Sequence, residues 1–353
     1  MKAKIAFMYG PHDLRIEERE IPALKPNELL IKVGACGICQ SDVECYEGHS
    51  AEGRYDIAPF TPGHEWSGQV VDMGSDVKDF RVGDKVTGDC VIPCGYCQNC
   101  KEGKMPSACL NMRELGFMPN SPGAMGEYLV LERDFTHKFP DDWSYFMGTW
   151  IENFSVGYWG IWGNGGSIDA SDDVVVIGGG PIGISATITA DVSGANVIMI
   201  DPLASRRERA KKYGADHVLD PTRGDIAQMV REVTDGRGAS CVVECSGNDI
   251  GIASAFDIAG HSARVGLVGH SIGRKVPAEL GKVIWSNLRV VGSGGTKNFL
   301  ERTIRFLSRI KDRYDFDALN SHYLPFADVH KGLEIASKEK QTAFKVMLTF
   351  DGK

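Results

Sequence analysis

The fold is decided by one stretch of this chain, Asp173–Gly183, with the sequence DVVVIGGGPIG. Its first half is an apolar, β-branched run that predicts a buried strand, and its second half is a glycine-rich turn leading into a helical segment. Further strands are expected at 196–200, 217–219, 241–244, 264–268 and 288–291, and helices at 181–193 and 203–213. Strands that alternate with helices predict an α/β fold with a doubly wound parallel sheet.

The turn in this stretch fits the pattern G-x-G-x-x-G through Gly178, Gly180 and Gly183. The first glycine allows a tight turn, the second lets the backbone approach a pyrophosphate, and the third lets the helix pack close to the strand. The helix begins at Pro181 and Ile182, where unpaired N–H groups and the positive end of the helix dipole favour phosphate. The pattern therefore predicts a dinucleotide site, with a βα turn that binds no nucleotide as the alternative.

The choice between NAD and NADP depends on Asp201, which ends the next strand. A carboxylate there is expected to accept hydrogen bonds from the adenosine ribose and to repel a 2′-phosphate, which favours NAD. Arg206 and Arg207 follow closely, and either is able to reach a phosphate, so NADP stays open as the alternative.

Composition limits the number of domains and the kinds of partner that this chain is expected to have. The 353 residues suit two domains, and 42% hydrophobic with 24% charged residues is typical of a soluble globular protein. A net charge of −8 argues against a nucleic-acid partner. No apolar run is long enough for a membrane span, and the N-terminal residues 1–8 predict a first strand rather than a signal peptide. We expect a cytoplasmic protein with no membrane partner.

Cysteines give the next signal, because five of the ten lie between residues 90 and 109. Four of them follow the spacing Cys94-x2-Cys97-x2-Cys100-x8-Cys109. Four thiolates surround a zinc ion tetrahedrally and leave no open position, so a structural role is expected for the segment 90–110. An iron–sulfur cluster is the alternative, since it also uses four cysteines with short gaps.

Two further segments, Cys36–Asp42 (CGICQSD) and Gly63–Glu65 (GHE), complete the pattern. Together with the glycine-rich turn and the four cysteines, they resemble the zinc-containing medium-chain dehydrogenase/reductase family over the full length of the chain. The resemblance implies two zinc ions per chain, one catalytic and one structural, and NAD as cofactor. It assigns Cys39 and His64 as ligands of the catalytic zinc, with Glu65 as a neighbouring or exchanging ligand and water as the alternative.

The resemblance also bears on the third zinc ligand. Many alcohol dehydrogenases of the family carry a cysteine before the nucleotide domain, but this chain has none between residues 110 and 240. Residues 150–157 (WIENFSVG) instead resemble the Ile-Glu-Pro segment of the polyol and threonine dehydrogenase branches, which implies Glu152 as the ligand. Asn153 replaces the proline, and a helix N-terminal charge is the alternative role for Glu152.

The mechanism that the resemblance implies is a hydride transfer between a secondary alcohol and nicotinamide. Zinc acts as a Lewis acid on the substrate hydroxyl. Ser41, two residues after Cys39, is expected to receive the hydroxyl proton. Many relatives place a histidine five residues after the ligand cysteine, where this chain has Glu44. Glu44, His49 or water completes the relay, and the sequence does not choose among them.

A polyol, cyclitol or sugar is the expected substrate, with a threonine-type amino alcohol or a simple secondary alcohol as the alternative. Arg113 and Glu114 are candidates for hydroxyl contacts, although a surface salt bridge is as compatible with the sequence. Two rival classes are a zinc-independent reductase on the same fold, which would lack Cys39 and His64, and a non-catalytic binding or redox-sensing protein.

The resemblance implies a Rossmann NAD-binding domain at 156–294 and a β-rich, GroES-like catalytic domain at 1–155 and 295–353. Relatives are dimers or tetramers, so we expect a homo-oligomer. The apolar run Leu288–Val291 is a candidate interface edge.

Overall fold

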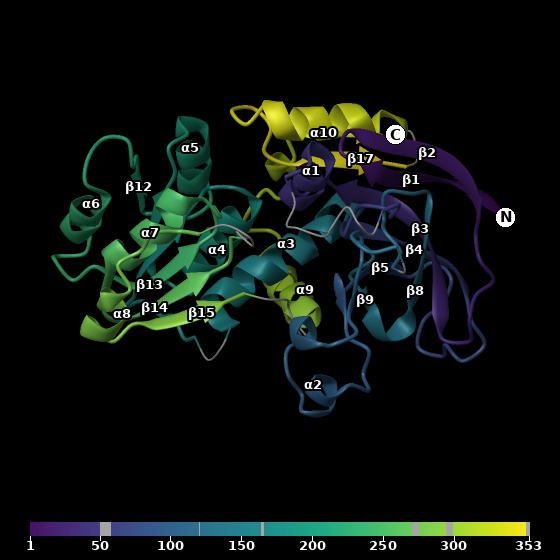
Figure 1. Cartoon of the computed structure of the whole chain (residues 1–353), viewed down its shortest axis with the longest axis horizontal. Coiled ribbons are helices and arrows are strands. Elements are labelled where there is room, and N and C mark those ends of the chain that lie inside the picture. The colour runs from purple at the N-terminus through teal and green to yellow at the C-terminus, as the bar shows by residue number, and fades with distance from the viewer. Residues whose placement is uncertain (50–57, 120, 164–165, 270–274, 294–298, 351–353) are drawn as a thin grey trace. The chain divides into compact units, whose positions relative to one another are not determined.

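The computed structural model describes residues 1–49, 58–119, 121–163, 166–269, 275–293 and 299–350. The chain divides into two compact units, one formed by Met1–Glu152 with Gly295–Lys353 and the other by Asn153–Gly294 (Figure 1). The division falls inside helix α3 (Tyr145–Trp162), and the boundary expected after residue 155 lies in the same helix. None of the helices in the described ranges combines the length and apolarity that crossing a bilayer requires.

The unit Asn153–Gly294 is built on a six-stranded parallel sheet, as predicted, with the order β12-β11-β10-β13-β14-β15. The order reverses direction between β10 and β13, and ligands of such sheets bind at the carboxyl ends of the strands beside this point. The strands are β10 (Asp173–Ile177), β11 (Asn196–Ile200), β12 (His217–Leu219), β13 (Ala239–Glu244), β14 (Ala259–Leu267) and β15 (Arg289–Gly292). The helices are α4 (Pro181–Val192), α5 (Ala204–Lys212), α6 (Ile226–Val233), α7 (Asp249–Ile258) and α8 (Gly281–Trp285).

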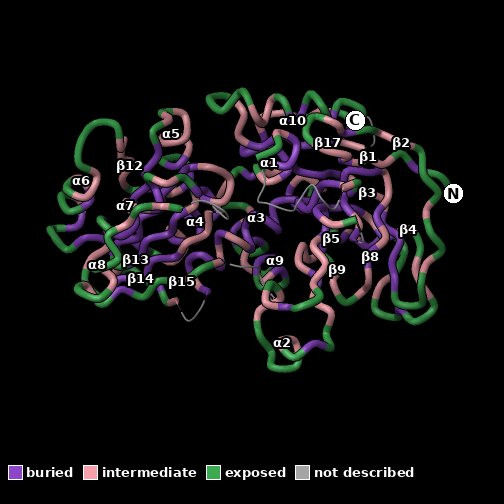
Figure 2. Tube along the Cα trace, viewed as in Figure 1, coloured by how far each residue is buried: buried purple, intermediate pink, exposed green. Residues whose placement is uncertain are grey.

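Strand β10 is buried along its whole length, which explains its unbroken apolar sequence. Figure 2 shows buried chain around β13 and α4 of the same unit and exposed chain around α6 and α8. On one face, Val175 shares a core with Val230 of α6 and Phe256 of α7. On the other face, Val176 lies against the start of α4, where a Cβ on Gly183 would come within 3.5 Å of its side chain. Both faces are therefore covered, as a doubly wound sheet requires.

The other unit contains a seven-stranded mixed sheet with the order β16-β17-β3-β4-β5-β9, and β8 also pairs with β3. Its strands are β3 (Glu28–Gly37), β4 (Glu65–Met73), β5 (Lys85–Gly88), β8 (Tyr128–Glu132), β9 (Thr136–Lys138), β16 (His322–Pro325) and β17 (Val346–Thr349). Two small antiparallel pairs are β1 (Lys2–Gly10) with β2 (Asp13–Glu20), and β6 (Val91–Ile92) with β7 (Arg113–Glu114). The helices of this unit are α1 (Gln40–Glu47), α2 (Gln98–Lys101), α9 (Phe299–Ile310) and α10 (Val329–Lys338).

Strand β3 is the centre of this sheet, because β4, β8 and β17 all pair with it. Its alternating residues Leu29, Ile31 and Val33 are buried in the core of the unit. The chain leaves β3 at Gly37 and enters α1 three residues later, while β4 starts at Glu65 directly opposite Gly37. The end of β3 therefore brings the segments 36–42 and 63–65 together.

The closing strand differs from its prediction at 344–348, because β17 begins two residues later, at Val346. Lys345 stands just before the strand with its side chain buried against Glu65. A buried ammonium needs a charged partner, and Glu65 provides it. The side chain of Lys345 therefore points inward one residue before the hydrogen-bonded strand β17 begins.

Candidate active site and metal centres

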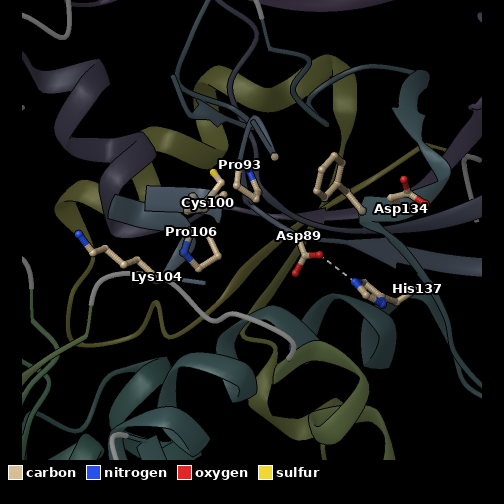
Figure 3. A pocket seen from close by; sticks show the side chains of 10 residues that line it. Asp89, Pro93, Cys100, Lys104, Pro106, Asp134 and His137 are labelled. Atoms are coloured by element: carbon tan, nitrogen blue, oxygen red, sulfur yellow. Dashed lines mark hydrogen bonds and ion pairs between the residues drawn. The ribbon is translucent and has the colours of Figure 1, made fainter. Parts of the chain in front are cut away.

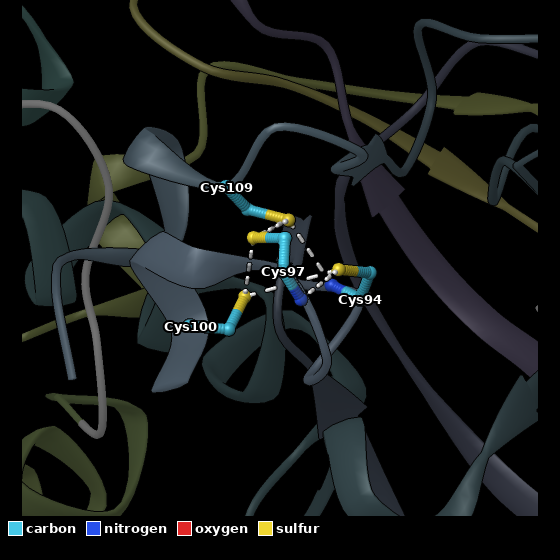
Figure 4. Close-up of side chains that lie close together, drawn as sticks. All are labelled: Cys94, Cys97, Cys100 and Cys109. Atoms are coloured by element: carbon cyan, nitrogen blue, oxygen red, sulfur yellow. Dashed lines mark hydrogen bonds between the residues drawn. The ribbon is translucent and has the colours of Figure 1, made fainter. Parts of the chain in front are cut away.

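The four cysteines predicted to bind one metal gather in the lobe around α2 (Figure 4). Their sulfur atoms are separated by 3.4 Å for Cys97 and Cys100, 3.9 Å for Cys97 and Cys109, and 4.0 Å for Cys94 and Cys100. Four sulfurs at about 2.3 Å from one zinc ion would lie about 3.8 Å apart in a tetrahedron. The cluster therefore fits a zinc ion with four thiolates and no open position.

Backbone N–H groups are arranged around the same sulfurs. The amide of Cys94 donates to the sulfur of Cys109 at 3.2 Å, and the amide of Cys97 donates to the sulfur of Cys94 at 3.4 Å. Backbone hydrogen bonds from Leu110 and Cys100 lower the pKa of Cys97 to about 6. Such bonds favour the thiolate form, which is the form that binds a metal.

A second group of candidate ligands forms at the end of β3. One ligand atom each of Cys39, His64 and Glu65 lies within 4.8 Å of the others. The ring of His64 is buried, and its Nδ1, which has no hydrogen-bond partner among the described residues, lies 3.9 Å from Asp42 Oδ1. A thiol, an imidazole and a carboxylate are all zinc donors, so the chemistry of this group fits a metal ion.

Asp42 organises this group, and the sequence reasoning missed its role. Cys39 is the N-cap of α1, and its backbone N–H donates to Asp42 Oδ2 at 2.9 Å in a capping box. The other oxygen, Oδ1, accepts from the backbone N–H of Gly63 at 3.3 Å. One buried carboxylate thus ties the segments of Cys39 and His64 together. The spacing C-x-x-D at the start of a helix was the available signal, because it matches a capping box.

Glu152 lies in the middle of α3 rather than at a helix start, and it is buried with 9% of its surface exposed. It stands outside the three-residue group defined by the 4.8 Å limit. Its electrostatic neighbours are nevertheless the residues of that group. Burial raises the pKa of Glu152 to about 7, while the charge of His64 opposes the rise and that of Glu65 adds to it.

The predicted relay residues follow Cys39 on α1. Ser41 and Glu44 are half-buried on this helix, and His49 is exposed just beyond it. The backbone N–H of His49 donates to the carbonyl of Glu44 at 2.9 Å. Which of these groups follows Ser41 in a relay stays a prediction.

The glycine-rich turn lies between β10 and α4, with Gly178 at a φ of +95° and Gly180 as the N-cap of α4. A Cβ on Gly183 would stand 1.8 Å from the carbonyl oxygen of Gly178, so only glycine fits there. A Cβ on Gly180 would meet no atom of the described residues within 4 Å apart from its chain neighbours, so no described side chain fills this part of the turn. The turn has the close helix packing and the open approach that a pyrophosphate requires.

Asp201 follows β11 and is buried beside this turn. Its Oδ2 accepts from the backbone N–H of Gly179 at 2.8 Å, and its Oδ1 accepts from that of Leu203 at 2.8 Å. Arg206 reaches to within 3.5 Å of the same carboxylate, whereas Arg207 pairs with Asp220 at 2.9 Å. A carboxylate has further lone pairs, so these bonds leave Asp201 able to accept a ribose hydroxyl.

Arg113 and Glu114 form the short strand β7, and the side chain of Arg113 is paired with Glu132. The structure therefore shows the salt bridge that the sequence had left as an alternative for Arg113.

A cavity of about 240 Å³ lies beside the cysteine lobe, apart from the predicted catalytic residues (Figure 3). Its walls include Cys100, Lys104 and Phe135, and His137 forms an ion pair across 2.9 Å with Asp89. Burial lowers the pKa of His137, but the hydrogen bond and charge of Asp89 outweigh it, so the pKa is raised from 6.5.

Comparison with known families gives two matches. Residues 25–141 match the model described as alcohol dehydrogenase GroES-like domain, and residues 181–309 match the model described as zinc-binding dehydrogenase. The first matched range contains the predicted ligands Cys39 and His64 and the cysteine lobe, and the second begins at Pro181, at the start of α4, and contains Gly183.

Three named proteins illustrate the likeness. The chain is 38% identical to scyllo-inosose 3-dehydrogenase of Thermotoga maritima over 254 residues, which cover 67% of this chain and 64% of that protein. It is 33% identical to sorbitol dehydrogenase of Halalkalibacterium halodurans over 305 residues, covering 84% and 85% respectively. Among solved structures, galactitol-1-phosphate dehydrogenase of Escherichia coli superposes with a TM-score of 0.87 at 26% identity, covering 98% of this chain and 99% of that one.

Proposed function

Because this chain belongs to the zinc-dependent medium-chain dehydrogenase family, we propose that it transfers a hydride between a secondary alcohol of a polyol, cyclitol or sugar and NAD(H). The observation that carries the proposal is the convergence of Cys39, His64 and Glu65 within 4.8 Å of one another. The named relatives act on sorbitol, scyllo-inosose and galactitol 1-phosphate, and all of these are polyhydroxylated.

The catalytic zinc is proposed to be held by Cys39, His64 and Glu152. Glu152 is supported by its burial and by its electrostatic coupling to His64 and Glu65. A zinc ion there supplies a Lewis acid that binds the substrate hydroxyl and lowers its pKa. Ser41 then accepts the hydroxyl proton from its place two residues after Cys39, at the start of α1.

The dinucleotide is proposed to bind at the glycine-rich turn, with its pyrophosphate at the N-terminus of α4 between Gly178, Gly180 and Gly183. Asp201 and Arg206 would lie beside the adenosine ribose. The buried charge of Asp201 supports NAD over NADP, because a 2′-phosphate would be repelled. The second zinc ion is proposed to hold the cysteine lobe together, in a structural role.

The decisive experiment replaces Glu152 by alanine. Two zinc ions per chain are expected in the unchanged protein and one in Glu152→Ala, with dehydrogenase activity lost and the circular dichroism spectrum retained. An NAD-linked absorbance assay on sorbitol, inositols, galactitol 1-phosphate, L-threonine and 2,3-butanediol identifies the substrate class. Glu132→Ala, which removes a carboxylate that pairs with Arg113, is the matched control and keeps both zinc ions. Two zinc ions in an active Glu152→Ala protein would place the ligand elsewhere.

A second copy of this chain is the proposed protein partner, in a homodimer or homotetramer. The outer edge of β15 pairs with no other strand of the described residues, and Ile284 and Trp285 of the adjacent α8 are 86% and 82% exposed. An open strand edge beside exposed apolar side chains is typical of an interface. Sedimentation velocity should show an oligomer that Trp285→Asp dissociates, and a monomeric unchanged protein would refute the proposal.

The cytoplasm is the proposed location, because thiolate zinc ligands require a reducing compartment. Cell fractionation with an antibody against the chain tests this directly.

A further inference from the structure

A carboxylate that the proposed mechanism does not use is buried at the end of β13, beside the glycine-rich turn. Glu244 has no exposed surface. Its Oε1 accepts from the backbone N–H of Ser246 at 2.8 Å and from the Ser246 hydroxyl, and the backbone N–H of Gly247 lies 3.2 Å from both carboxylate oxygens. Burial raises the pKa of Glu244, and these hydrogen bonds oppose the rise. The following turn thus supplies the donors that a buried carboxylate requires.

The hydrogen bonds of Ser246 extend this network to helix α7. The Ser246 hydroxyl, which donates to Glu244, accepts from the side-chain amide of Asn248 at 2.7 Å. Asn248 is the N-cap of α7, and its Oδ1 accepts from the backbone N–H of Gly251 at 2.7 Å. The carboxylate therefore fixes the turn 245–248 between the end of β13 and the start of α7.

The turn 245–248 packs against the glycine-rich turn. The backbone N–H of Cys245 donates to the carbonyl of Ile177 at 2.8 Å, which continues the pairing of β13 with β10. A Cβ on Gly178 would come within 2.9 Å of Ser246, so only glycine lets the two turns approach this closely. A shift of the turn 245–248 would therefore change the space beside Gly178.

The chain after β14 encloses the same turn from the other side. The carbonyl of Glu244 accepts from the backbone N–H groups of Val268 at 2.8 Å and Gly269 at 2.9 Å. A Cβ on Gly269 would stand 2.2 Å from the backbone nitrogen of Gly247 and 2.7 Å from Glu244 Oε2. Glu244 thus organises the carboxyl edge of the sheet from β10 to β14.

The place of the turn 245–248 in the sheet assigns it to one half of a dinucleotide. Sheets of this kind bind the two halves of a dinucleotide on either side of the point where the strand order reverses. Asp201 follows β11, on one side of β10, and would lie beside the adenosine ribose in the proposed function. Strand β13 lies on the other side of β10, so the turn that follows it belongs to the nicotinamide half.

We propose that Glu244 is a positioning residue for the nicotinamide half of the cofactor, because its carboxylate holds the turn 245–248 against Gly178. This inference rests on the proposed NAD-dependent function. Removing the carboxylate would leave buried N–H groups without an acceptor, and the turn would have to rearrange to satisfy them. The adenosine half, beside Asp201, does not depend on these hydrogen bonds.

The experiment compares the binding of NADH with that of AMP, which contains only the adenosine half, in the full-length protein. NADH binding is followed by fluorescence titration and AMP binding by calorimetry. Glu244→Ala should raise Kd for NADH by about tenfold and leave Kd for AMP within about twofold. Asp173→Ala is the matched control and should change neither Kd, because Asp173 is also a buried carboxylate but lies at the amino end of β10, where it accepts from Asn196 at 2.8 Å.

Two conservative variants keep the test decisive if Glu244→Ala does not fold. Glu244→Gln should retain the unchanged protein's Kd for NADH, because its amide oxygen still accepts from the N–H groups of Ser246 and Gly247. Glu244→Asp keeps the charge but is one methylene too short to reach both groups, so its Kd for NADH should rise by about threefold or more. The reverse order, with Gln weakened and Asp unchanged, would show that charge matters rather than position and would overturn the inference.

An unchanged Kd for NADH in Glu244→Ala would also overturn it. So would an equal loss of NADH and AMP affinity, because a general loosening of the unit weakens both halves of the site. Failure of the unchanged protein to bind NADH would instead refute the proposed function itself.

Discussion

Arg264 offers a quantitative test of how the unit Asn153–Gly294 holds the end of helix α3. This arginine lies on β14 with 8% of its surface exposed. Its guanidinium donates to the carbonyls of Gly160 at 2.6 Å and Gly163 at 3.2 Å, and also to that of Ile161. The last carbonyls of a helix have no partner within the helix, so Arg264 acts as a buried cap with the favourable charge for this end.

Replacing Arg264 by methionine keeps much of the side-chain volume and removes every donor. Hydrogen bonds from a charged group contribute about 1.5–3 kcal/mol each, and a cation in a partly buried site at a helix C-terminus contributes up to about 2 kcal/mol. The contributions of the separate hydrogen bonds and of the helix dipole are not additive. Removing the arginine also removes the cost of burying its charge, which offsets part of the loss. We therefore expect the free energy of unfolding to fall by about 3–5 kcal/mol.

The assay is urea denaturation followed by tryptophan fluorescence, because Trp159 and Trp162 lie in the last turns of α3. With a slope near 3 kcal/mol per molar, the midpoint should drop by about 1–1.7 M urea. Arg237→Met is the control, since the guanidinium of Arg237 is mostly exposed and pairs with the buried Asp173 in the same unit, and its loss should cost only about 1 kcal/mol. A loss in Arg264→Met no larger than in this control would refute the capping role.

Three further predictions concern the lobe, the turn and the cavity. Cys97→Ser should remove one zinc ion and make the segment 90–110 sensitive to limited proteolysis, and an intact, protease-resistant lobe would contradict its structural role. Gly178→Ala places a Cβ 2.9 Å from Ser246 at a φ of +95°, so KM for NAD should rise by about tenfold or more while kcat changes less, as steady-state kinetics would reveal. The ion pair of protonated His137 with Asp89 stabilises the fold, and the pKa of His137 is therefore raised from 6.5 in the folded protein. This stabilisation is complete below pH 6.5, and the free energy of unfolding should decline as the pH rises through the folded-state pKa. Asp89→Asn should flatten that decline in urea titrations at several pH values, and an equal slope in both proteins would exclude this ion pair as its source.

Much of the nucleotide-binding unit was determined by local sequence. The strand at 173–177 was predicted with the bounds that it has, because a fully buried parallel strand must be apolar at every position. The start of the helix after the turn was also predictable from local sequence. Gly183 packs against the backbone of Gly178, which is only five residues earlier in the chain. The grouping of Cys94, Cys97, Cys100 and Cys109 was also legible, because short spacings keep ligands near one another whatever the fold does.

Tertiary structure alone decided the charges around the candidate catalytic centre. Glu65 and Lys345 are 280 residues apart, and only the register of β4 and β17 on either side of Gly37 makes them an ion pair. Asp42 of α1 gained its second partner, Gly63 just before β4, through a long-range contact that no local pattern predicts. The sequence determined which residues are capable of binding a metal or a phosphate, since that depends on residue type and spacing. The fold determined which charges surround them, because burial and long-range contact set the electrostatics of a site.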